Sequence, residues 1–305
     1  MKVGIIALAK NENLYIKEWA EHHFNIGFDH IIICDNNDVD DEKISDVLHD
    51  ERVTIVDYRG IRDRFQSDFY KDVYTKYRKC FDWLMFLDVD EFVEIQGFRD
   101  VHDYLSQDMF KNKDVIRLTW KVYTDSGLLD VVDGDYSVKR FTDFITDRIR
   151  GRYFSLRYTK CFLRCTIYSP TIKIINHNII NVERRECNSV GEHCHGLQEI
   201  EEPIYERAWV NHYMTKTIGE YITQKFFRGG VNKNAGRYRL MYFFDINEIT
   251  NEKVEYALKL LREEYGKRGQ ELPASIEKEA SIILKHLKFG DSHRILNNRK
   301  IRGLD

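Results

Sequence analysis

Four consecutive residues carry the strongest chemical signal in this sequence. Asp88-Val89-Asp90-Glu91 directly follow the apolar run WLMFL at 83–87. Alternate side chains of an extended strand share one face, so Asp88 and Asp90 are expected to point the same way. Two carboxylates on one face repel each other unless a cation or hydrogen-bond donors lie between them. Mg²⁺ and Mn²⁺ favour oxygen ligands and also bind diphosphate oxygens, so the motif predicts a site for a divalent ion and a diphosphate. An acidic strand end that caps the next helix is the alternative.

The elements that must position this motif can be predicted from the preceding residues. Short β-branched apolar runs predict buried strands at 3–8, 30–34, 53–58 and 83–87. Helical spacing predicts the intervening helices at 16–24, 44–48 and 65–80. This alternation predicts an α/β fold with parallel strands and crossover helices. Ligands of such sheets bind beyond the carboxyl ends of the strands, so the polar segments 10–12 and 35–38 are candidate ligand loops.

The later part of the chain predicts a change of architecture. Strands are expected at 115–123, 160–168, 171–180 and 209–213, and the pattern becomes helical from Thr217. We therefore expect an α/β domain at 1–215, which contains the acidic motif and the candidate ligand loops, and a helical C-terminal extension at 216–305.

Composition narrows the function classes. The 305 residues are 43% apolar and 32% charged, with a formal net charge of −3, so the chain is not basic and nucleic acid is not an expected partner. Aromatic residues make up 13%, which suits a core and, in smaller part, sugar binding. No apolar run is long enough for a signal peptide or a membrane span. We expect a cytoplasmic protein, at most peripheral at the inner face of a membrane, with its six cysteines reduced.

Two histidine-containing segments are weaker candidates for metal binding than the acidic motif. One contains Cys187, His193, Cys194 and His195, but adjacent ligands do not match the usual two-plus-two zinc spacing, which favours a polar surface loop. The other is His22-His23 on a predicted helix, where neighbouring positions do not converge on one metal, so one surface and one core residue are expected.

Three segments together resemble a known family. They are KNENLYIKEWAEHHFNIGFDHIIICDNND, DWLMFLDVDEFVE and NHYMTKTIGEYITQKFFRGG, and they span roughly residues 1–230. This ordered set resembles the glycosyltransferase family 2-like proteins of the family 92 type, which have the GT-A fold. The resemblance implies a metal-dependent glycosyltransferase that uses Mn²⁺ or Mg²⁺. It would move a sugar from a nucleotide-sugar donor, a UDP-sugar above all, to a glycan or lipid-linked acceptor with inversion.

The resemblance also implies a role for each matching residue. Those expected against the nucleotide are Lys10, Asn11 and Glu12, with Asp35 and Asn37 at the base or ribose. Those expected at the metal and diphosphate are Asp88, Asp90 and, late in the chain, His212. Those expected to neutralise phosphate charge are Lys216 and Arg228. A neutral imidazole suits Mn²⁺, although a structural histidine at a strand end is the alternative for His212.

An inverting transfer needs a base for the acceptor hydroxyl. Asp125, in the run YTDSG, is the first candidate, and Glu192 and Glu183 are its rivals. An ordinary turn aspartate is the competing interpretation of Asp125. Trp120 and Tyr123 could stack on the acceptor sugar or belong to the core.

Two other functions remain open from the sequence. A nucleotidyltransferase that makes the activated sugar would use a similar sheet, but its usual Gly-rich loop is replaced here by KNEN after the first strand. A non-catalytic glycan-binding or assembly protein could use the helical end, 251–305, to contact a partner or an anionic membrane.

Overall fold

The chain forms two compact units. The computed structural model describes residues 1–61, 66–146, 149–150, 154–155, 158–175, 178–180, 182–194, 203–228 and 239–288. The first unit comprises residues 1–121 and 156–212, and the second comprises 122–155 and 213–305. The boundary expected at 215/216 lies close to 212/213, where the chain passes from the first unit to the second. The grouping of 122–155 with the C-terminal helices was not expected from the sequence.

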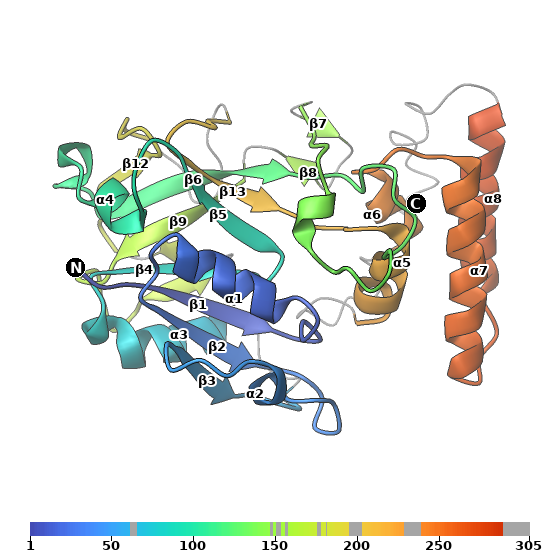
Figure 1. The fold of residues 1–305 in the computed structure, drawn as a ribbon, viewed down its shortest axis with the longest axis horizontal. Helices are drawn as coiled ribbons and strands as arrows, with labels where there is room; N and C mark the ends of the chain where they lie inside the picture. Colours follow the sequence, from blue (N-terminus) through green and yellow to red (C-terminus); the bar gives the residue numbers. More distant parts are fainter. Residues whose placement is uncertain are drawn as a thin grey trace. The chain divides into compact units, whose positions relative to one another are not determined.

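A mixed β-sheet, nine-stranded within the described residues, forms the first unit. Four adjacent strands are parallel, in the order β3 (Val53–Asp57), β2 (His30–Asp35), β1 (Val3–Ala9) and β4 (Trp83–Leu87). Figure 1 shows these strands in blue and cyan. Strands β1 and β4 are buried along their whole length, as their continuous apolar runs predict. The parallel core expected from the sequence is therefore present.

The remaining strands extend the sheet beyond β4. They are β9 (Thr159–Arg164), β6 (Val115–Val122), β13 (Ala208–His212) and β5 (Glu91–Ile95), with β12 (Glu186–Asn188) alongside β6. Strand β9 runs antiparallel to both β4 and β6, and β13 runs antiparallel to β5. A separate antiparallel pair consists of β10 (Lys173–Ile175) and β11 (Asn178–Ile180). Strand β5 was not predicted, because it begins inside the acidic motif.

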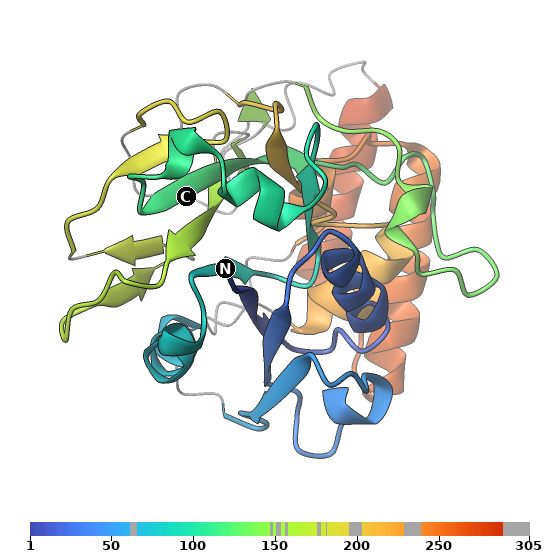
Figure 2. The ribbon, with the colours of Figure 1, turned by 60° about the vertical axis from the view of Figure 1, so that its left-hand side comes forward.

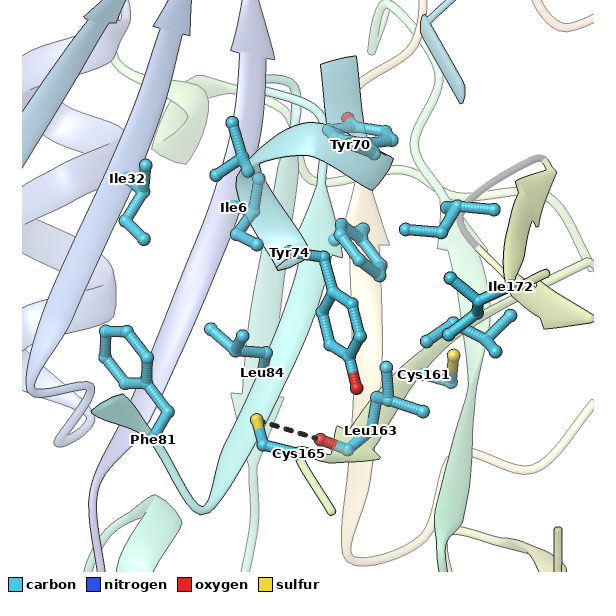
Figure 3. Packing of buried hydrophobic residues seen from close by; sticks show 14 of the residues in the cluster. Ile6, Ile32, Tyr70, Tyr74, Phe81, Leu84, Cys161, Leu163, Cys165 and Ile172 are labelled. Carbon is cyan, nitrogen blue, oxygen red and sulfur yellow. Dashed lines mark hydrogen bonds between the residues drawn. The ribbon is translucent and has the colours of Figure 1, made fainter. Parts of the chain in front are cut away.

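Helices α1 (Ile16–Asn25) and α3 (Gln66–Tyr77) lie on two sides of the parallel strands (Figures 1 and 2). The shorter helices of this unit are α2 (Ile44–Val47), η1 (Arg78–Cys80), α4 (Val101–Leu105) and η2 (Asp108–Phe110). Figure 3 shows Tyr70 and Tyr74 of α3 packed near Ile6 and Leu84 of the sheet. Each such fully buried side chain contributes about 1.5–3 kcal/mol. This packing anchors α3 on strands β1 and β4.

The second unit is mainly helical among the residues described. Its helices are α5 (Ile218–Glu220), η4 (Tyr221–Phe226), α6 (Leu240–Phe244), α7 (Asn251–Lys267) and α8 (Ala274–Lys288). The short elements are η3 (Val138–Arg140), β7 (Ile149–Arg150) and β8 (Phe154–Ser155). Helices α7 and α8 run side by side (Figures 1 and 2), and Val254, Leu261 and Ile283 are fully buried in the core that they help to form. The described residues after Thr217 are mainly helical, and the part of this expectation that covers 229–238 and 289–305 lies outside them.

None of the helices in the described part of the chain combines the length and the apolarity that a membrane crossing requires.

Candidate functional site

The expected ligand loops meet at one edge of the sheet. Strand β1 lies between β2 and β4, and all three run in the same direction. Their carboxyl ends are therefore neighbours, and the segments 10–12, 35–38 and 88–91 follow those ends. This is the edge at which ligands of open α/β sheets bind.

The acidic motif forms a turn rather than an extended strand end. Strand β4 ends at Leu87, and Val89 and Asp90 are turn residues. The turn is closed by Glu91, whose amide donates to the Asp88 carbonyl at 3.1 Å and whose Oε2 accepts from the Asp88 amide at 2.9 Å. The strand alternation that was expected to align Asp88 with Asp90 is thus wrong. Glu91 instead makes both hydrogen bonds to the backbone of Asp88.

A buried lysine neutralises part of this motif. Lys160 of β9 has no solvent exposure, and its Nζ lies 2.9 Å from Asp88 Oδ2 and 2.7 Å from Glu91 Oε2. Burial acts to lower the pKa of Lys160, but the Asp88 and Glu91 carboxylates outweigh it, so the pKa is raised and the ammonium stays charged. No motif in the sequence points to this residue. The available signal was a lysine among the apolar residues of the strand TKCFLR.

His212 approaches the motif from the neighbouring strand pair. It stands opposite Glu91 in the β13–β5 register. Its Nε2 lies 3.5 Å from Asp90 Oδ1, and its Nδ1 lies 3.8 Å from Glu91 Oε1. Within the described residues this Nδ1 is buried and makes no hydrogen bond. The ring of Trp120 packs edge-on against the imidazole at 4.5 Å between centroids. The structure therefore brings Asp90 and His212 together, and their binding of a metal stays a prediction.

Asp90 and His212 fit a divalent ion only as part of a larger ligand set. Among the described residues, no group of three or more His, Cys, Asp or Glu has the arrangement of a metal centre. Mg²⁺ is commonly held by one or two carboxylates together with substrate phosphates and water, which such a pair allows. The three carboxylates and the Lys160 ammonium leave two negative charges, which match one divalent ion.

Helix α1 holds the strand that follows the turn. Trp19 Nε1 donates to the Glu91 carbonyl at 2.7 Å, and His22 Nε2 donates to the Val93 carbonyl at 2.7 Å. The Val93 amide in turn donates to His23 Nε2 at 3.3 Å. His23 is fully buried and His22 is half-buried, close to the surface-plus-core arrangement expected for this pair. Helix α1 thus positions Glu91 through the backbone of β5.

The residues after β1 and β2 bind mainly to each other. The Asn11 amide donates to Asn37 Oδ1 at 2.7 Å, with Asn11 in the left-handed region at φ 54°. Asn37 Nδ2 donates to the Glu42 carbonyl at 2.7 Å. The Asp35 carboxylate accepts from the amides of Asn37 and Ile44, at 3.0 and 3.1 Å. Asp35 and Asn37 therefore fix the shapes of these loops, and their contact with a nucleotide stays a prediction.

Lys10 and Glu12 lie between the end of β1 and the start of α1. Lys10 Nζ lies 3.9 Å from Asp38 Oδ2, and both side chains are partly exposed. The Glu12 carbonyl accepts from the amides of Tyr15 and Ile16 at 2.9 Å, so its backbone begins the helix. Their side chains are at the expected sheet edge, and their part in nucleotide binding is untested.

Asp125 lies in the second unit as part of a buried ion pair. It is 2% exposed, and its Oδ2 lies 2.6 Å from Lys253 Nζ. Its Oδ1 accepts from the Gly127 amide at 3.0 Å, and its own amide donates to Asn247 Oδ1 at 2.6 Å. Burial raises the pKa of Asp125, while Lys253 opposes that rise. This geometry is that of an Asx turn and favours the turn interpretation over catalysis.

The other predicted residues are divided between the units. Lys216, nearly buried with φ 54°, and Arg228 belong to the second unit. Tyr123 stacks on Tyr213 in that unit, with 4.7 Å between ring centroids. Trp120 belongs to the first unit, where its ring contacts the His212 imidazole and has Lys160 Nζ at 5.8 Å.

The rival acids and the cysteine–histidine segment lie elsewhere in the first unit. Glu183 and Glu192 are both exposed. Burial raises the pKa of the Cys187 thiol to about 12 and that of Cys194 to about 11, which disfavours the thiolate that a metal needs. His195 lies outside the described residues.

A cavity of about 280 Å³ lies away from these residues, at the amino end of β4. Its lining includes Arg78, Lys79, Asp82 and Arg164. It contains none of the residues that the sequence singled out.

Two curated relatives match part of the chain. A glycosyltransferase family 92 protein of Oryza sativa subsp. japonica is 24% identical over 102 residues, 33% of this chain and 18% of that protein. A glycosyltransferase family 92 protein of Ricinus communis is 25% identical over 130 residues, 42% of this chain and 24% of that protein. The chain therefore spans less than a quarter of the length of these relatives. At this coarse level, the chain is similar to proteins named as transferases of sugars.

The other comparisons add little. No family model matches the chain. A 4-diphosphocytidyl-2C-methyl-D-erythritol synthase from Anaerococcus prevotii DSM 20548 aligns over 54% of this chain and 72% of that one, with 17% identity and a TM-score of 0.27. A likeness at that score assigns no fold, so the chain is described as a mixed α/β protein and the GT-A fold stays a prediction.

Proposed function

We propose that this protein is a metal-dependent glycosyltransferase that transfers a sugar from a nucleotide-sugar donor to a glycan or lipid-linked acceptor. The observation that carries the proposal is the approach of His212 to Asp90, at 3.5 Å, at the carboxyl edge of the parallel strands. The partial similarity to two proteins named glycosyltransferase family 92 supports the same class of reaction.

The proposed division of roles follows from the contacts of each residue. Asp90 and His212 would hold the divalent ion, which acts as a Lewis acid on the departing diphosphate. Lys160 holds the carboxylates of Asp88 and Glu91 at fixed positions. Asp88, whose side chain is one-third exposed, would accept hydrogen bonds from donor hydroxyls.

Further residues complete the proposal. Lys216 and Arg228 would add positive charge against the donor phosphates, as the family resemblance implies. The acceptor hydroxyl needs a base within hydrogen-bond reach if the transfer inverts configuration. Asp125 is one candidate, and its pairing with Lys253 makes it a weaker one than its sequence context suggests.

Product analysis tests the proposal and separates it from sugar activation. The full chain is incubated with a panel of nucleotide sugars and Mn²⁺, and the nucleotide products are identified by chromatography. Release of a nucleoside diphosphate, lost when EDTA is added and in Asp90→Asn, is the expected result. Formation of a nucleotide sugar and pyrophosphate from a sugar phosphate and a nucleoside triphosphate would instead identify a nucleotidyltransferase. Failure to turn over any donor, with folded protein and Mn²⁺ present, would contradict the proposal.

A further inference from the structure

A permanent positive charge lies inside the acidic motif. The side chain of Lys160 is 0% exposed, and it contacts one oxygen each of Asp88 and Glu91. Burying an ammonium costs several kcal/mol unless it is paired, so a lysine is retained here only with these carboxylates around it. The lysine supplies the cation that adjacent carboxylates require.

This ammonium excludes a metal ion from the space that it fills. A divalent ion would have to lie about 2.1 Å from the oxygens that it binds. Lys160 Nζ already lies 2.9 Å from Asp88 Oδ2 and 2.7 Å from Glu91 Oε2. An ion bound to both of these atoms would overlap the ammonium.

The two oxygens of Glu91 face different neighbours. Glu91 Oε2 faces Lys160, whereas Glu91 Oε1 lies 3.8 Å from His212 Nδ1. His212 Nε2 then reaches Asp90. The Glu91 carboxylate therefore lies between two places: one is occupied by the Lys160 ammonium, and the other is next to Asp90 and His212.

We propose that Lys160 is a built-in cation that limits the acidic motif to one divalent ion, held on the side of Asp90 and His212. This inference rests on the proposed function only for the statement that the motif binds a metal. It makes Lys160 a positioning residue, because the lysine acts through Asp88 and Glu91 and not on the reacting atoms.

Mn²⁺ binding without nucleotide tests the inference. The variants Lys160→Met and Lys160→Arg of the full chain are titrated with Mn²⁺, and free Mn²⁺ is measured by electron paramagnetic resonance. Removal of one positive charge leaves three negative charges, so K160M should bind Mn²⁺ at least about tenfold more tightly than wild type. K160R keeps the charge and should bind Mn²⁺ like wild type. Mn²⁺ should also raise the melting temperature of K160M more than that of wild type.

A double variant keeps the test decisive if K160M does not fold. Glu91→Gln removes the second charge of the buried pair, so K160M/E91Q retains neutral partners in the core. The same lysine change should strengthen Mn²⁺ binding at least about tenfold between E91Q and K160M/E91Q. If Lys160 has only a packing role, replacing it with Met should leave the Mn²⁺ affinity unchanged in both the wild-type and the E91Q protein.

A matched control removes a different buried lysine. Lys253 is 4% exposed at its side chain and lies 2.6 Å from Asp125, so Lys253→Met also breaks a buried pair. It should lower the melting temperature and leave the Mn²⁺ affinity unchanged. Equal Mn²⁺ affinity of K160M and wild type, weaker binding by K160M, or no Mn²⁺ binding by any variant would overturn the inference. A protein that shows the lysine effect but turns over no donor would refute the proposed function and leave this inference standing.

Discussion

The Nε2 atom of His212 lies 3.5 Å from the Oδ1 atom of Asp90. The two residues come from segments far apart in the chain, and they meet because β13 pairs with β5 so that His212 stands opposite Glu91. A shift of the pairing by one residue would turn His212 to the other face of the sheet. The β13–β5 register therefore determines that the His212 imidazole lies next to the acidic motif.

Removing either member of this pair should impair metal-dependent donor binding. In Asp90→Asn and His212→Ala, we expect the Mn²⁺-dependent affinity for a nucleoside diphosphate to fall at least about tenfold, since loss of even an outer-shell partner costs about 10–100-fold. Calorimetry with and without Mn²⁺ measures the change. Trp209→Phe, on the same strand as His212, is the control and should keep its affinity. Full affinity in both site variants would refute the assignment.

Because of the buried His23, we expect the free energy of unfolding to fall at acidic pH. Burial holds the pKa of His23 well below its ordinary value of 6.5, with His22 adding to this effect and the Trp19 carbonyl opposing it. The unfolded chain therefore binds more protons than the folded one below about pH 6.5, so stability is lost as the pH falls through this range. The loss should be at most about 1.4 kcal/mol per pH unit.

Urea unfolding of wild type and His23→Gln from pH 8 to pH 5 checks this prediction. Gln has no charge to gain, so the variant should lose less stability than wild type over that range. Identical pH slopes for the two proteins would show that His23 does not contribute.

Replacing Asp125, which pairs with Lys253, tests whether this aspartate has a structural or a catalytic role. Loss of the carboxylate in Asp125→Ala leaves a buried ammonium, which should cost about 3–5 kcal/mol of stability. Turnover per folded molecule, measured at low temperature, should stay within a few-fold of wild type. A catalytic base predicts the opposite pattern, with turnover falling about 10²–10⁴-fold. Such a fall in a folded variant would restore Asp125 as the base.

Gly219 is required by close packing in the second unit. A Cβ at this position would lie 2.4 Å from Asp130 Cγ. Asp130 cannot move freely, because its Oδ1 accepts from the Val131 amide at 2.8 Å and its Oδ2 accepts from the Tyr256 hydroxyl. Gly219→Ala should therefore lower the free energy of unfolding by about 1–3 kcal/mol.

A second glycine in the same unit provides the contrast. A Cβ at Gly266 of α7 would meet no atom within 4 Å. Gly266→Ala should raise the free energy of unfolding by about 0.5–1 kcal/mol in the same denaturation experiment. Equal effects of the two substitutions would show that the contact with Asp130 is not the cause.

The sequence predicted the parts of the fold that depend on local pattern. The strands β1 to β4 are short apolar runs, and their order along the chain determines a parallel sheet whose carboxyl edge collects 10–12, 35–38 and 88–91. The turn at Val89–Asp90 was not predicted, because the alternation of an extended strand stops at Leu87, where β4 ends. It depends on Glu91 closing back on the Asp88 amide.

The contacts between distant strands were not predictable in the same way. Lys160 reaches Asp88 because β9 inserts antiparallel between β4 and β6, which no local pattern indicates. Its position in an apolar strand was a usable signal, since a buried lysine requires a carboxylate partner. His212 was expected through the family resemblance, but its distance from Asp90 depends on the β13–β5 register.

The most direct test of the central claim is the binding of UDP to the wild-type chain and to D90N, with Mn²⁺ and with EDTA, by isothermal titration calorimetry. If Asp90 holds the divalent ion, the wild type with Mn²⁺ gives heat of binding, EDTA removes most of it, and D90N with Mn²⁺ shows a comparable loss. Binding of UDP that is equally tight in all three conditions, or that is absent for every nucleoside diphosphate with Mn²⁺, would contradict this claim.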